Sequence, residues 1–501
     1  MRNQGIGSWP ARRARKTPER IAIEHDNDQW TYRDLNDRVQ RLAHALRRLG
    51  VARGDRVAYL GPNHPAFLET FFAAGVLGAI FVPLNTRLAA AELSVQLADA
   101  GVGTLVYDPR LAAVATELTA DRTVVVGDGY EQLLAASEST PIDEVVAHDD
   151  PCIIMYTSGT TGTPKGAVLT HGNITWNAVN VVVDSDLAGD EVTLIVAPLF
   201  HTAGLNMNCL PTLLKGGRVV LEAAFDPGRV LRLVEQRRIT LMFAVPAMFN
   251  TLAAHPRWPE TDLSSLRTIM CGGAPVPEAT IHTYLKRGLA FVQGYGMTEA
   301  SPGVLLLDRS QVLAKAGSAG VPHFFTDVRV TNPDLTDAKP GEKGEVLVAG
   351  PNVMPGYWQR PEANAAAFTD DGVWFHSGDV AVTDEDGYVY LVDRVKDMII
   401  SGGENIYPAE VEKALAEHPA VLDAGVFGVP DEKWGEVGCA VVVLTPGQQA
   451  DADGLRAFLQ GRIAKYKIPA SFRFVDELPR SGAGKILKNR LREAYGPRPG
   501  G

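Results

Sequence analysis

The sequence predicts an α/β protein with a large N-terminal domain of layered α/β sheets with a distorted barrel, and a small mobile α+β C-terminal domain. Short apolar segments alternate with amphipathic segments through the first four-fifths of the chain, a pattern typical of largely parallel sheets covered by helices. After Asp379 the pattern changes to a hairpin signal, a polar joint and a short series of strands and helices. The 501 residues allow two to four domains at roughly 100–200 residues each.

The elements of the large domain follow from this alternation. Seven apolar segments are expected to form buried strands: Arg56–Leu60, Cys152–Tyr156, Thr193–Ala197, Arg218–Leu221, Leu241–Val245, Arg267–Cys271 and Ala290–Gln293. Three segments carry apolar residues at helical spacing: Tyr32–Leu49, Pro227–Arg237 and Pro277–Lys286. Because helical segments separate the strands, we expect parallel pairing.

The C-terminal part begins with a hairpin signal at Asp384–Gly387, a turn composition between two short strand-like segments. A polar joint follows at Asp393–Asp397. Beyond it we expect a helix at Pro408–Glu417, strands at Leu422–Val429 and Gly438–Leu444, and a helix at Asp453–Leu459. We therefore divide the chain into an N-terminal domain at 1–393, a hinge at 394–396 and a C-terminal domain at 397–501.

The composition excludes several classes of protein. A net charge of −11 and a pI near 5.5 leave no overall basic field for a nucleic-acid partner. None of the four cysteines lies in a C-x-x-C pair, so neither a structural zinc site nor a disulfide framework is expected. The longest apolar run, Phe71–Leu84, is shorter than the about 20 residues of a transmembrane segment. With no signal peptide visible, we expect a cytoplasmic protein.

The strongest chemical signal is a string rich in glycine and hydroxyl groups that follows a buried strand. It reads Thr157-Ser158-Gly159-Thr160-Thr161-Gly162-Thr163-Pro164-Lys165-Gly166. The glycines allow the backbone to approach an anion, and the hydroxyls and the lysine supply donors for phosphate oxygens. It is not a Walker A loop, because Pro164 and Gly166 flank the lysine where that motif needs Gly-Lys-[Ser/Thr]. The string therefore predicts a phosphate site outside the ordinary P-loop class.

Three shorter strings follow apolar segments and suit the rest of a nucleotide. Gly294-Tyr295-Gly296-Met297-Thr298-Glu299 offers a ring for a purine, and a hydroxyl and a carboxylate for a phosphate and its Mg²⁺. Gly273-Ala274-Pro275 is a small-residue turn that a planar group could approach, although a simple tight turn also explains it. Asp379 follows His376-Ser377-Gly378 and could accept both ribose hydroxyls, the alternative being an ordinary turn cap.

Two single residues carry weaker signals. Lys485 stands on a glycine-rich string, where a solvated surface charge is the usual role, and His201 ends an apolar segment, where a core or capping histidine is common. The sequence contains no His/Cys/Asp cluster with zinc spacing and no Gly-x-Ser-x-Gly nucleophile elbow.

Together these strings resemble the adenylate-forming superfamily of acyl- and aryl-CoA synthetases, peptide-synthetase adenylation domains and luciferases. The resemblance extends from Trp30 to Lys485 with every core motif in order. The chain is most similar to bacterial fatty acyl-CoA synthetases, through the strings at 315–320, 396–405 and 431–436. The resemblance implies two half-reactions: a carboxylic acid attacks ATP to give acyl-adenylate and pyrophosphate, and the thiol of CoA then displaces AMP.

The resemblance also assigns roles around the nucleotide. Thr157–Gly166 would hold the β- and γ-phosphates, with Thr157 and Glu299 near Mg²⁺. Gly273, Ala274, Pro275 and Tyr295, with the neighbouring Gly294, Gly296 and Met297, would frame adenine. Thr298 would contact the α-phosphate, and Asp379 and Arg394 the ribose. The resemblance makes Lys485, Thr298 and Glu299 the catalytic residues, since Lys485 would bridge the substrate carboxylate and the α-phosphate.

Further implied roles concern the moving parts and the other substrates. Lys396 would be the hinge about which a mobile C-terminal lid rotates between the half-reactions. Gly402, Gly403, Glu404 and Trp434 would approach CoA. Phe200 and His201 match the gating position at the mouth of the acyl pocket, and Gly204, Leu205 and Phe243 would line it. His376-Ser377 stands where Arg-Thr is commoner in the superfamily, a departure that leaves the ribose carboxylate in place.

The leading expectation is an ATP-dependent, Mg²⁺-requiring acyl-CoA ligase whose partners are a small-molecule carboxylic acid, ATP and CoA. Three alternatives stay open: transfer to a carrier-protein thiol, activation of another oxyanion such as nitrite, and a catalytically silent nucleotide-binding protein. A monomer and a homodimer fit the sequence equally.

The resemblance to fatty acyl-CoA synthetases implies a fatty acid as the substrate. The segments at 202–208, 242–248, 272–274 and 301–304 are expected to line its pocket, and they are mostly small and aliphatic. The sequence shows no buried cation for a second carboxylate, which disfavours a dicarboxylate. Asn206 and Asn208 could be polar contacts of the pocket or surface and helix residues, and the latter is favoured.

Overall fold

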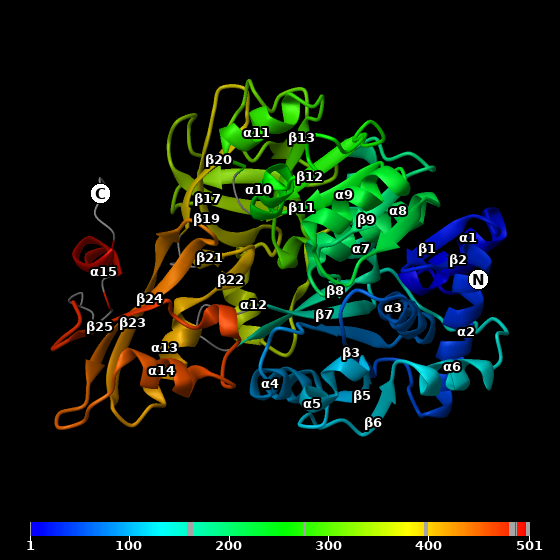
Figure 1. Cartoon of the computed structure of the whole chain (residues 1–501), viewed down its shortest axis with the longest axis horizontal. Coiled ribbons are helices and arrows are strands. Elements are labelled where there is room, and N and C mark those ends of the chain that lie inside the picture. Colours follow the sequence, from blue (N-terminus) through cyan, green and yellow to red (C-terminus); the bar gives the residue numbers. More distant parts are fainter. Residues whose placement is uncertain are drawn as a thin grey trace. The chain divides into compact units, whose positions relative to one another are not determined.

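The computed structural model describes residues 2–157, 164–273, 276–394, 399–479, 486 and 488–496. Contacts divide the chain into two compact units, drawn together in Figure 1. The first contains Met1–Thr86, Leu97–Met155 and Gly166–Asp393. The second contains Arg87–Gln96, Tyr156–Lys165 and Arg394–Gly501.

A seven-stranded sheet is built mainly from the N-terminal part of the chain (Figure 1). Its order is β18 (Gly356–Tyr357), β8 (Lys165–Thr170), β7 (Pro151–Thr157), β4 (Ile80–Leu84), β3 (Arg56–Leu60), β5 (Val102–Tyr107) and β6 (Arg122–Val125). The central strands pair in parallel. The helices of this region are α1 (Trp9–Lys16), α2 (Tyr32–Arg48), α3 (Pro65–Leu77), α4 (Ala90–Ala100), α5 (Ala112–Ala115) and α6 (Asp128–Ala135).

A nine-stranded sheet forms the middle of the first unit. Its order is β15 (Val321–Pro322), β14 (Gly303–Leu307), β13 (Phe291–Gly296), β12 (Thr268–Gly272), β11 (Leu241–Ala244), β9 (Val192–Ile195), β10 (Arg218–Leu221), β1 (Ile21–His25) and β2 (Asp28–Thr31). Pairing from β13 to β1 is parallel, and the strands at both edges are antiparallel. The parallel α/β layers expected from the alternation are therefore confirmed.

Helices cover both faces of this sheet. Helices α9 (Pro227–Gln236), α10 (Pro246–Ala254) and α11 (Glu278–Leu285) pack on one face, where Phe249 and Tyr284 share a core cluster with Met242. On the other face α7 (His171–Asp184) and the π-helix η3 (Ala203–Cys209) contribute Val181 and Met207 to a cluster with Phe243. Met242 and Phe243 serve opposite faces because successive strand side chains alternate. Helix α8 (Leu210–Lys215) follows η3 directly.

A four-stranded sheet completes the first unit, in the order β16 (Asp327–Thr331), β17 (Gly344–Ala349), β19 (Phe375–Thr383) and β20 (Val389–Arg394). The predicted hairpin turn joins β19 and β20, and the Gly387 amide donates to the Asp384 carbonyl at 3.1 Å. The first unit also contains the short helix η4 (Thr298–Ala300) and helix α12 (Pro361–Ala367).

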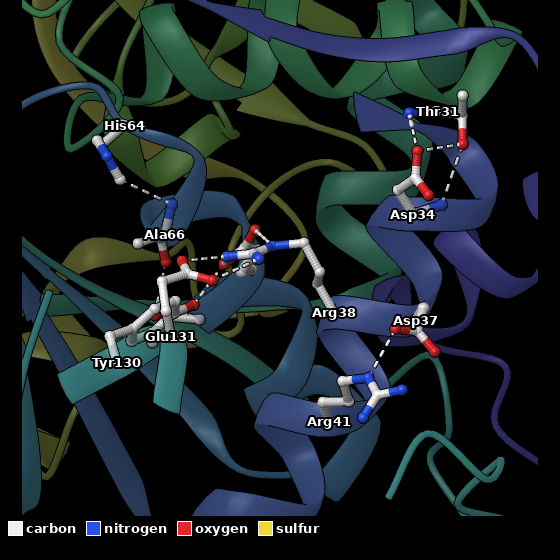
Figure 2. A network of polar contacts seen from close by, with 11 residues as sticks. Thr31, Asp34, Asp37, Arg38, Arg41, His64, Ala66, Tyr130 and Glu131 are labelled. Carbon is white, nitrogen blue, oxygen red and sulfur yellow. Dashed lines mark hydrogen bonds and ion pairs between the residues drawn. The ribbon is translucent and has the colours of Figure 1, made fainter. Parts of the chain in front are cut away.

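The N-terminal region is held by a partly buried ion network on α2 (Figure 2). Thr31 and Asp34 form a reciprocal capping box at the start of the helix. One turn further, the Arg38 guanidinium binds the buried Glu69 of α3 at 2.6 Å and Glu131 of α6 at 2.7 Å. Burial opposes the charge of Arg38, but its bonds to both carboxylates outweigh burial and raise its pKa. The network therefore ties three helices together as one charged, fully paired group.

The second unit contains a five-stranded sheet with the order β22 (Glu404–Ile406), β21 (Ile399–Ser401), β24 (Gly435–Leu444) and β23 (Val421–Asp431), and with β25 (Ser471–Val475) in parallel beside β24. Its helices are α13 (Pro408–Ala416), α14 (Ala452–Leu459) and α15 (Lys488–Tyr495). The helices and strands expected for this part of the chain are confirmed, each within three residues. Its hydrophobic residues pack in a cluster around Ile399, Val426 and Leu455.

One predicted strand is longer than expected. The sequence suggested a strand at Ala290–Gln293 followed by a loop, but β13 continues to Gly296. The reason is tertiary: β14 lies alongside and pairs Tyr295 with Leu305. The expected adenine-binding residues Gly294 to Gly296 therefore lie on a strand rather than on a loop.

Candidate active site

The phosphate string begins and ends on neighbouring strands. Thr157 is the last residue of β7 and Lys165 the first of β8. The Thr157 hydroxyl donates to the Lys165 carbonyl at 3.4 Å, which brings the two ends of the string together. Ser158, Gly159, Thr160, Thr161 and Gly162 lie outside the described residues, so their place in the proposed phosphate site stays a prediction.

The two strings expected near adenine follow adjacent parallel strands. Gly272, at the end of β12, pairs with Gly294 of β13, and Gly273 continues from there with a φ of +82°. Ala274 and Pro275 lie outside the described residues. On β13, a Cβ at Gly296 would lie 1.9 Å from the Pro302 carbonyl oxygen. Only glycine permits this approach. Gly296 therefore allows the segment at Pro302, which follows Glu299, to pack directly against β13.

The proposed ribose carboxylate touches the proposed purine-stacking ring. The Tyr295 hydroxyl donates to Asp379 Oδ2 at 2.6 Å, although the residues lie on β13 and β19, in different sheets. The Asp379 amide in turn donates to the Ser377 hydroxyl at 3.1 Å. Charge-assisted bonds of this kind fix the orientation of a carboxylate. The structure thus joins two residues that the sequence separates by 84 positions.

Glu299 is positioned by a residue that the sequence reasoning missed. The Tyr357 hydroxyl of β18 donates to Glu299 Oε1 at 2.9 Å, and the Met354 amide donates to the Glu299 carbonyl at 2.8 Å. Glu299 and Thr298 lie on the short helix η4 directly after β13. No local pattern around Tyr357 distinguishes it from a core tyrosine, so its role emerges only from the fold.

Helix α7 holds the segments around η4 through buried amides. Asn173 donates to the carbonyls of Pro351 and Val353, both at 2.8 Å. One turn on, Asn177 accepts from the Gly303 amide at 3.0 Å. Asn352 then donates to the carbonyls of Ala300 and Gly303 at 2.9 and 2.8 Å. Buried polar groups paired in this way specify one backbone position for the residues on either side of Glu299.

The residues predicted to line the acyl pocket fall into two clusters. Phe243 packs with Met207, Met270, Val292 and Leu306 on the helix-covered face of the nine-stranded sheet. Phe200 and Leu205 belong to the large N-terminal core instead, although the Phe200 ring also lies 4.8 Å from the His201 ring. A Cβ at Gly204 would meet the Pro198 carbonyl oxygen at 2.4 Å, so this glycine faces backbone.

In the second unit, two of the residues predicted to approach CoA, Gly402 and Gly403, form a turn that packs against the half-exposed ring of Trp434. Gly402 and Gly403 connect β21 to β22, and the Gly402 amide donates to the Trp434 carbonyl at 2.8 Å. Gly402 has a φ of +57°, and a Cβ there would lie 2.7 Å from the Trp434 ring. Glu404 is buried and forms an ion pair with Arg87.

The structure does not describe the side chains of three predicted site residues. Arg394 ends β20, but its side chain lies outside what the structure describes, as do Lys396 and Lys485. Their roles as ribose contact, hinge and adenylation lysine stay predictions.

All four cysteines are buried and free. Burial raises the pKa of Cys152, Cys209 and Cys271 well above the ordinary thiol value. A thiol held neutral in an apolar interior is a poor nucleophile. We therefore assign these three thiols no role as nucleophiles.

The fold consists of layered parallel sheets, and the strings at the strand ends suit phosphates, a purine and a ribose. These features are those of a nucleotide-dependent enzyme of the adenylate-forming class. The chain belongs to the AMP-binding enzyme family, whose model matches residues 10–358, and the model of that family's C-terminal domain matches residues 410–485.

Known relatives share almost the whole chain. Feruloyl-CoA synthase of an Amycolatopsis species is 60% identical over 99% of this chain and 100% of the relative. Indoleacetate–CoA ligase of Aromatoleum aromaticum is 44% identical over 97% and 98%. A long-chain-fatty-acid–CoA ligase of Mycobacterium tuberculosis is 39% identical over 98% and 99%.

Among solved structures, o-succinylbenzoate CoA synthetase of Bacillus subtilis bound to a product analogue matches with a TM-score of 0.89, at 35% identity over 97% of this chain and 98% of that one. The same synthetase has been solved with ATP and a magnesium ion, at a TM-score of 0.72, with 36% identity over 97% of this chain and 99% of that one.

This chain is therefore an AMP-forming acid–thiol ligase that uses a carboxylic acid, ATP and CoA, as expected. The finer expectation of a fatty acid is not supported, because the aryl-acid relatives are more similar than the fatty-acid ligase. Within the described residues, no helix has the length and apolar character needed to cross a membrane.

Proposed function

We propose that this enzyme is a hydroxycinnamate–CoA ligase, with ferulic acid as the representative substrate. The observation that carries the proposal is the 60% identity to feruloyl-CoA synthase along 99% of the chain. The indoleacetate ligase, at 44% identity, is also named for an aryl acid.

The cluster around Phe243 suits a flat ring. Phe243, Met207, Met270, Val292 and Leu306 form an apolar wall on one face of the sheet. Aromatic rings gain from such contacts by burial and by favourable ring and sulfur contacts. The two methionines can adapt to ring substituents, because their unbranched side chains have several rotatable bonds. The wall therefore supports an aryl group as the activated acid.

The proposed chemistry needs charge compensation rather than a general base. The substrate carboxylate is already ionised near pH 7, and it must approach the anionic phosphates of ATP. Lys485 would neutralise this repulsion in the transition state, and Thr298 would donate to the α-phosphate. Asp379, oriented by Tyr295, would accept the ribose hydroxyls. The absence of a catalytic triad from the sequence is consistent with this mechanism.

The residues around Glu299 fit Mg²⁺. The ion prefers oxygen ligands and is commonly held by one or two carboxylates together with substrate phosphates. Glu299, oriented by Tyr357, would supply one such oxygen, and the resemblance implies that the Thr157 hydroxyl would supply another. Among the residues that the structure describes, no group of three or more His, Cys, Asp and Glu side chains could hold a metal. The related synthetase of Bacillus subtilis has been solved with both ATP and a magnesium ion.

The test is a substrate comparison with the purified enzyme, Mg²⁺, ATP and CoA. Ferulic acid, 4-coumaric acid, indole-3-acetic acid, decanoic acid and palmitic acid would each be assayed for AMP release and for the acyl-CoA thioester. We expect the hydroxycinnamic acids to have the highest kcat/KM. A higher kcat/KM for either fatty acid or for indole-3-acetic acid would contradict the proposal.

A further inference from the structure

The strand that carries Asp379 does not pair evenly with its neighbour. In the antiparallel pair, Leu347 of β17 lies opposite His376 of β19, and Glu345 of β17 lies opposite Val380 of β19. The three residues between these positions on β19 therefore stand against a single residue of β17. Such bulges bend a strand, re-aim a side chain and are frequent beside active sites. Here the bulge contains the proposed ribose carboxylate itself.

The Glu345 side chain binds two of the residues that precede Asp379. Its Oε1 accepts from the Gly378 amide at 3.1 Å, and its Oε2 lies 3.0 Å from Nδ1 of His376. An ionised carboxylate only accepts hydrogen bonds, so the His376 Nδ1 carries the hydrogen in this pair. One side chain of β17 thus holds β19 at one and at three positions before Asp379.

The backbone of the bulge depends on side chains as acceptors. Extra residues in a bulge are left out of the strand ladder. The Gly378 amide donates to Glu345 instead, and the Asp379 amide donates to the Ser377 hydroxyl at 3.1 Å. Gly378 has a φ of +72°, which glycine adopts without steric cost. A Cβ there would meet no atom within 4 Å, so the backbone conformation, and not crowding, calls for glycine.

The bulge directs a carboxylate toward another sheet. Asp379 Oδ2 accepts from the Tyr295 hydroxyl at 2.6 Å. Tyr295 lies on β13 of the nine-stranded sheet, whereas Asp379 lies on the four-stranded sheet (Figure 1). Functional side chains must be held within about 0.5 Å of their productive geometry by the residues behind them. Tyr295 holds the end of the Asp379 side chain, and Glu345 holds the backbone from which that side chain starts.

We infer that Glu345 and His376 are positioning residues for Asp379, acting through the backbone of the bulge. The inference rests on the ribose role of Asp379 within the proposed function. The Glu345 and His376 side chains are 30% and 28% exposed, and an ion pair at such exposure contributes little to stability. Its removal should therefore affect the position of Asp379 more than the fold. The pair also gives a structural role to His376, which stands where arginine is commoner in the superfamily.

This role predicts a change in the choice between nucleotides. Asp379 would accept from the ribose hydroxyls, and 2′-deoxyATP lacks one of these hydroxyls while keeping the adenine and the phosphates. A carboxylate held in place distinguishes the two nucleotides, because the missing hydroxyl leaves it short of a donor. A displaced carboxylate distinguishes them less. Damage to the fold, by contrast, lowers the use of both nucleotides equally.

The measured quantity is kcat/KM for ATP divided by kcat/KM for 2′-deoxyATP, from pyrophosphate release with CoA and the acid that the enzyme uses best. In the unaltered enzyme we expect a ratio of at least about 10. Glu345→Leu removes both acceptor oxygens and should lower the ratio by about 5-fold or more. Glu345→Gln keeps an oxygen for the Gly378 amide, so its ratio should stay within about 2-fold of the unaltered value. An unchanged ratio in folded Glu345→Leu would overturn the inference.

Asp379→Ala separates the inference from the assignment on which it rests. This variant should bring the ratio close to one. An unchanged ratio in Asp379→Ala would refute the ribose role, and the inference with it. A low ratio in Asp379→Ala beside an unchanged ratio in Glu345→Leu would overturn the role of Glu345 alone. Because the acid is chosen by its activity, failure of the aryl acids would contradict the proposed function and leave this comparison intact.

Two further variants separate positioning from general damage. His376→Phe removes only one of the two bonds to Glu345 and should lower the ratio less than Glu345→Leu does. If Glu345→Leu does not fold, an unchanged ratio in His376→Phe overturns the inference. Glu342→Leu is the matched control, because Glu342 is an exposed carboxylate that accepts from the Lys339 amide at 3.0 Å in the turn before β17. A ratio that falls equally in Glu342→Leu would also overturn the inference.

Discussion

Lys485 is the residue on which the proposed first half-reaction depends most. We expect Lys485→Ala to reduce acyl-adenylate formation by roughly 10²–10³-fold or more, because it removes a charge directed at the transition state. Thioester formation from supplied adenylate should be spared. Both half-reactions would be measured separately, with pyrophosphate release for the first and acyl-CoA formation from synthetic adenylate and CoA for the second. An equal loss in both would show that the lysine is not specific to adenylation.

Glu299 and Tyr357 should act together on Mg²⁺. Glu299→Gln removes an anionic ligand from a hard cation, so we expect weaker use of ATP and a Mg²⁺ optimum at higher concentration. Tyr357→Phe removes only the bond that orients the carboxylate at 2.9 Å, and a bond to a charged group is worth about 1.5–3 kcal/mol. Loss of that bond should therefore lower kcat/KM for ATP by roughly 10- to 150-fold. Full activity in excess chelator, or an unshifted optimum in Glu299→Gln, would contradict this assignment.

His171 should make stability depend on pH. It begins α7, accepts a hydrogen bond from the Ile6 amide at 3.1 Å, and burial lowers its pKa to about 4. An unfolded histidine titrates near about 6.5, so below that pH the unfolded chain takes up a proton that the folded chain refuses. The contribution of neutral His171 to the free energy of unfolding is thus complete above about pH 6.5 and is lost as the pH falls toward 4. By pH 5 the free energy of unfolding should have decreased by about 2 kcal/mol.

The measurement compares thermal midpoints at pH 7 and pH 5. The decrease between the two should be smaller in His171→Asn, whose amide oxygen can still accept from Ile6, than in the unaltered enzyme. His282→Asn is the control, since His282 is exposed. A decrease of the same size in all three proteins would refute the role of His171.

At the scale of elements, α7 positions several backbone segments of the proposed active site. Its asparagines recur one turn apart, and each binds a different backbone segment. Asn173 holds Pro351 and Val353, Asn177 holds Gly303, and Asn180 holds Phe325. The consequence is that the strand ends around Glu299 are positioned by one helix rather than by their own loops. This explains how the proposed catalytic carboxylate of Glu299 can be held on a short helix of three residues.

Asn173→Leu tests this role. The change removes two side-chain bonds to carbonyls and one arm of the capping box at Thr170, and it leaves the two carbonyls buried without their donor. We expect the protein to lose about 2–4 kcal/mol of stability and to use ATP less efficiently. The measurements are the thermal midpoint and kcat/KM for ATP. Val183→Thr, on the exposed side of the same helix, should change stability by no more than about 0.5 kcal/mol.

At the scale of the molecule, the two half-reactions need different surfaces of the C-terminal domain. Lys485 would serve adenylation and Gly402–Gly403 the approach of CoA, and one rigid domain cannot present both to the same site. We therefore predict a rotation about Lys396. Proline fixes φ near −65° and restricts the preceding residue. If the adenylation arrangement accepts that φ, Lys396→Pro should still form acyl-adenylate and then stall before acyl-CoA.

The paired measurement is single-turnover formation of acyl-adenylate and formation of acyl-CoA from preformed adenylate. Lys396→Ala is the control, because it removes the side chain while keeping the backbone free. Normal rates for both steps in Lys396→Pro would refute rotation about this residue. A thermal midpoint equal to that of the unaltered enzyme establishes that any stalled step does not arise from misfolding.

Much of this protein follows from the sequence alone. Alternating apolar and amphipathic segments determine parallel α/β layers, because a parallel sheet must be covered on both faces. Strings such as Thr157–Gly166 and Gly294–Glu299 indicate nucleotide chemistry, because glycines, hydroxyls and charges in short-range order already specify what a loop can bind. Those features are local, so a one-dimensional reading captures them.

What only the tertiary structure decided concerns residues that meet across the fold. The bond from Tyr295 to Asp379 joins two sheets, and Tyr357 reaches Glu299 from a strand 58 residues away. The burial of Asn206 and Asn208 without partners depends on what α7 and the sheet place around η3. Sequence periodicity reports which face of an element is apolar, but not which element covers it. Pairing and desolvation are properties of the packed chain, and so they appear only when the chain is folded.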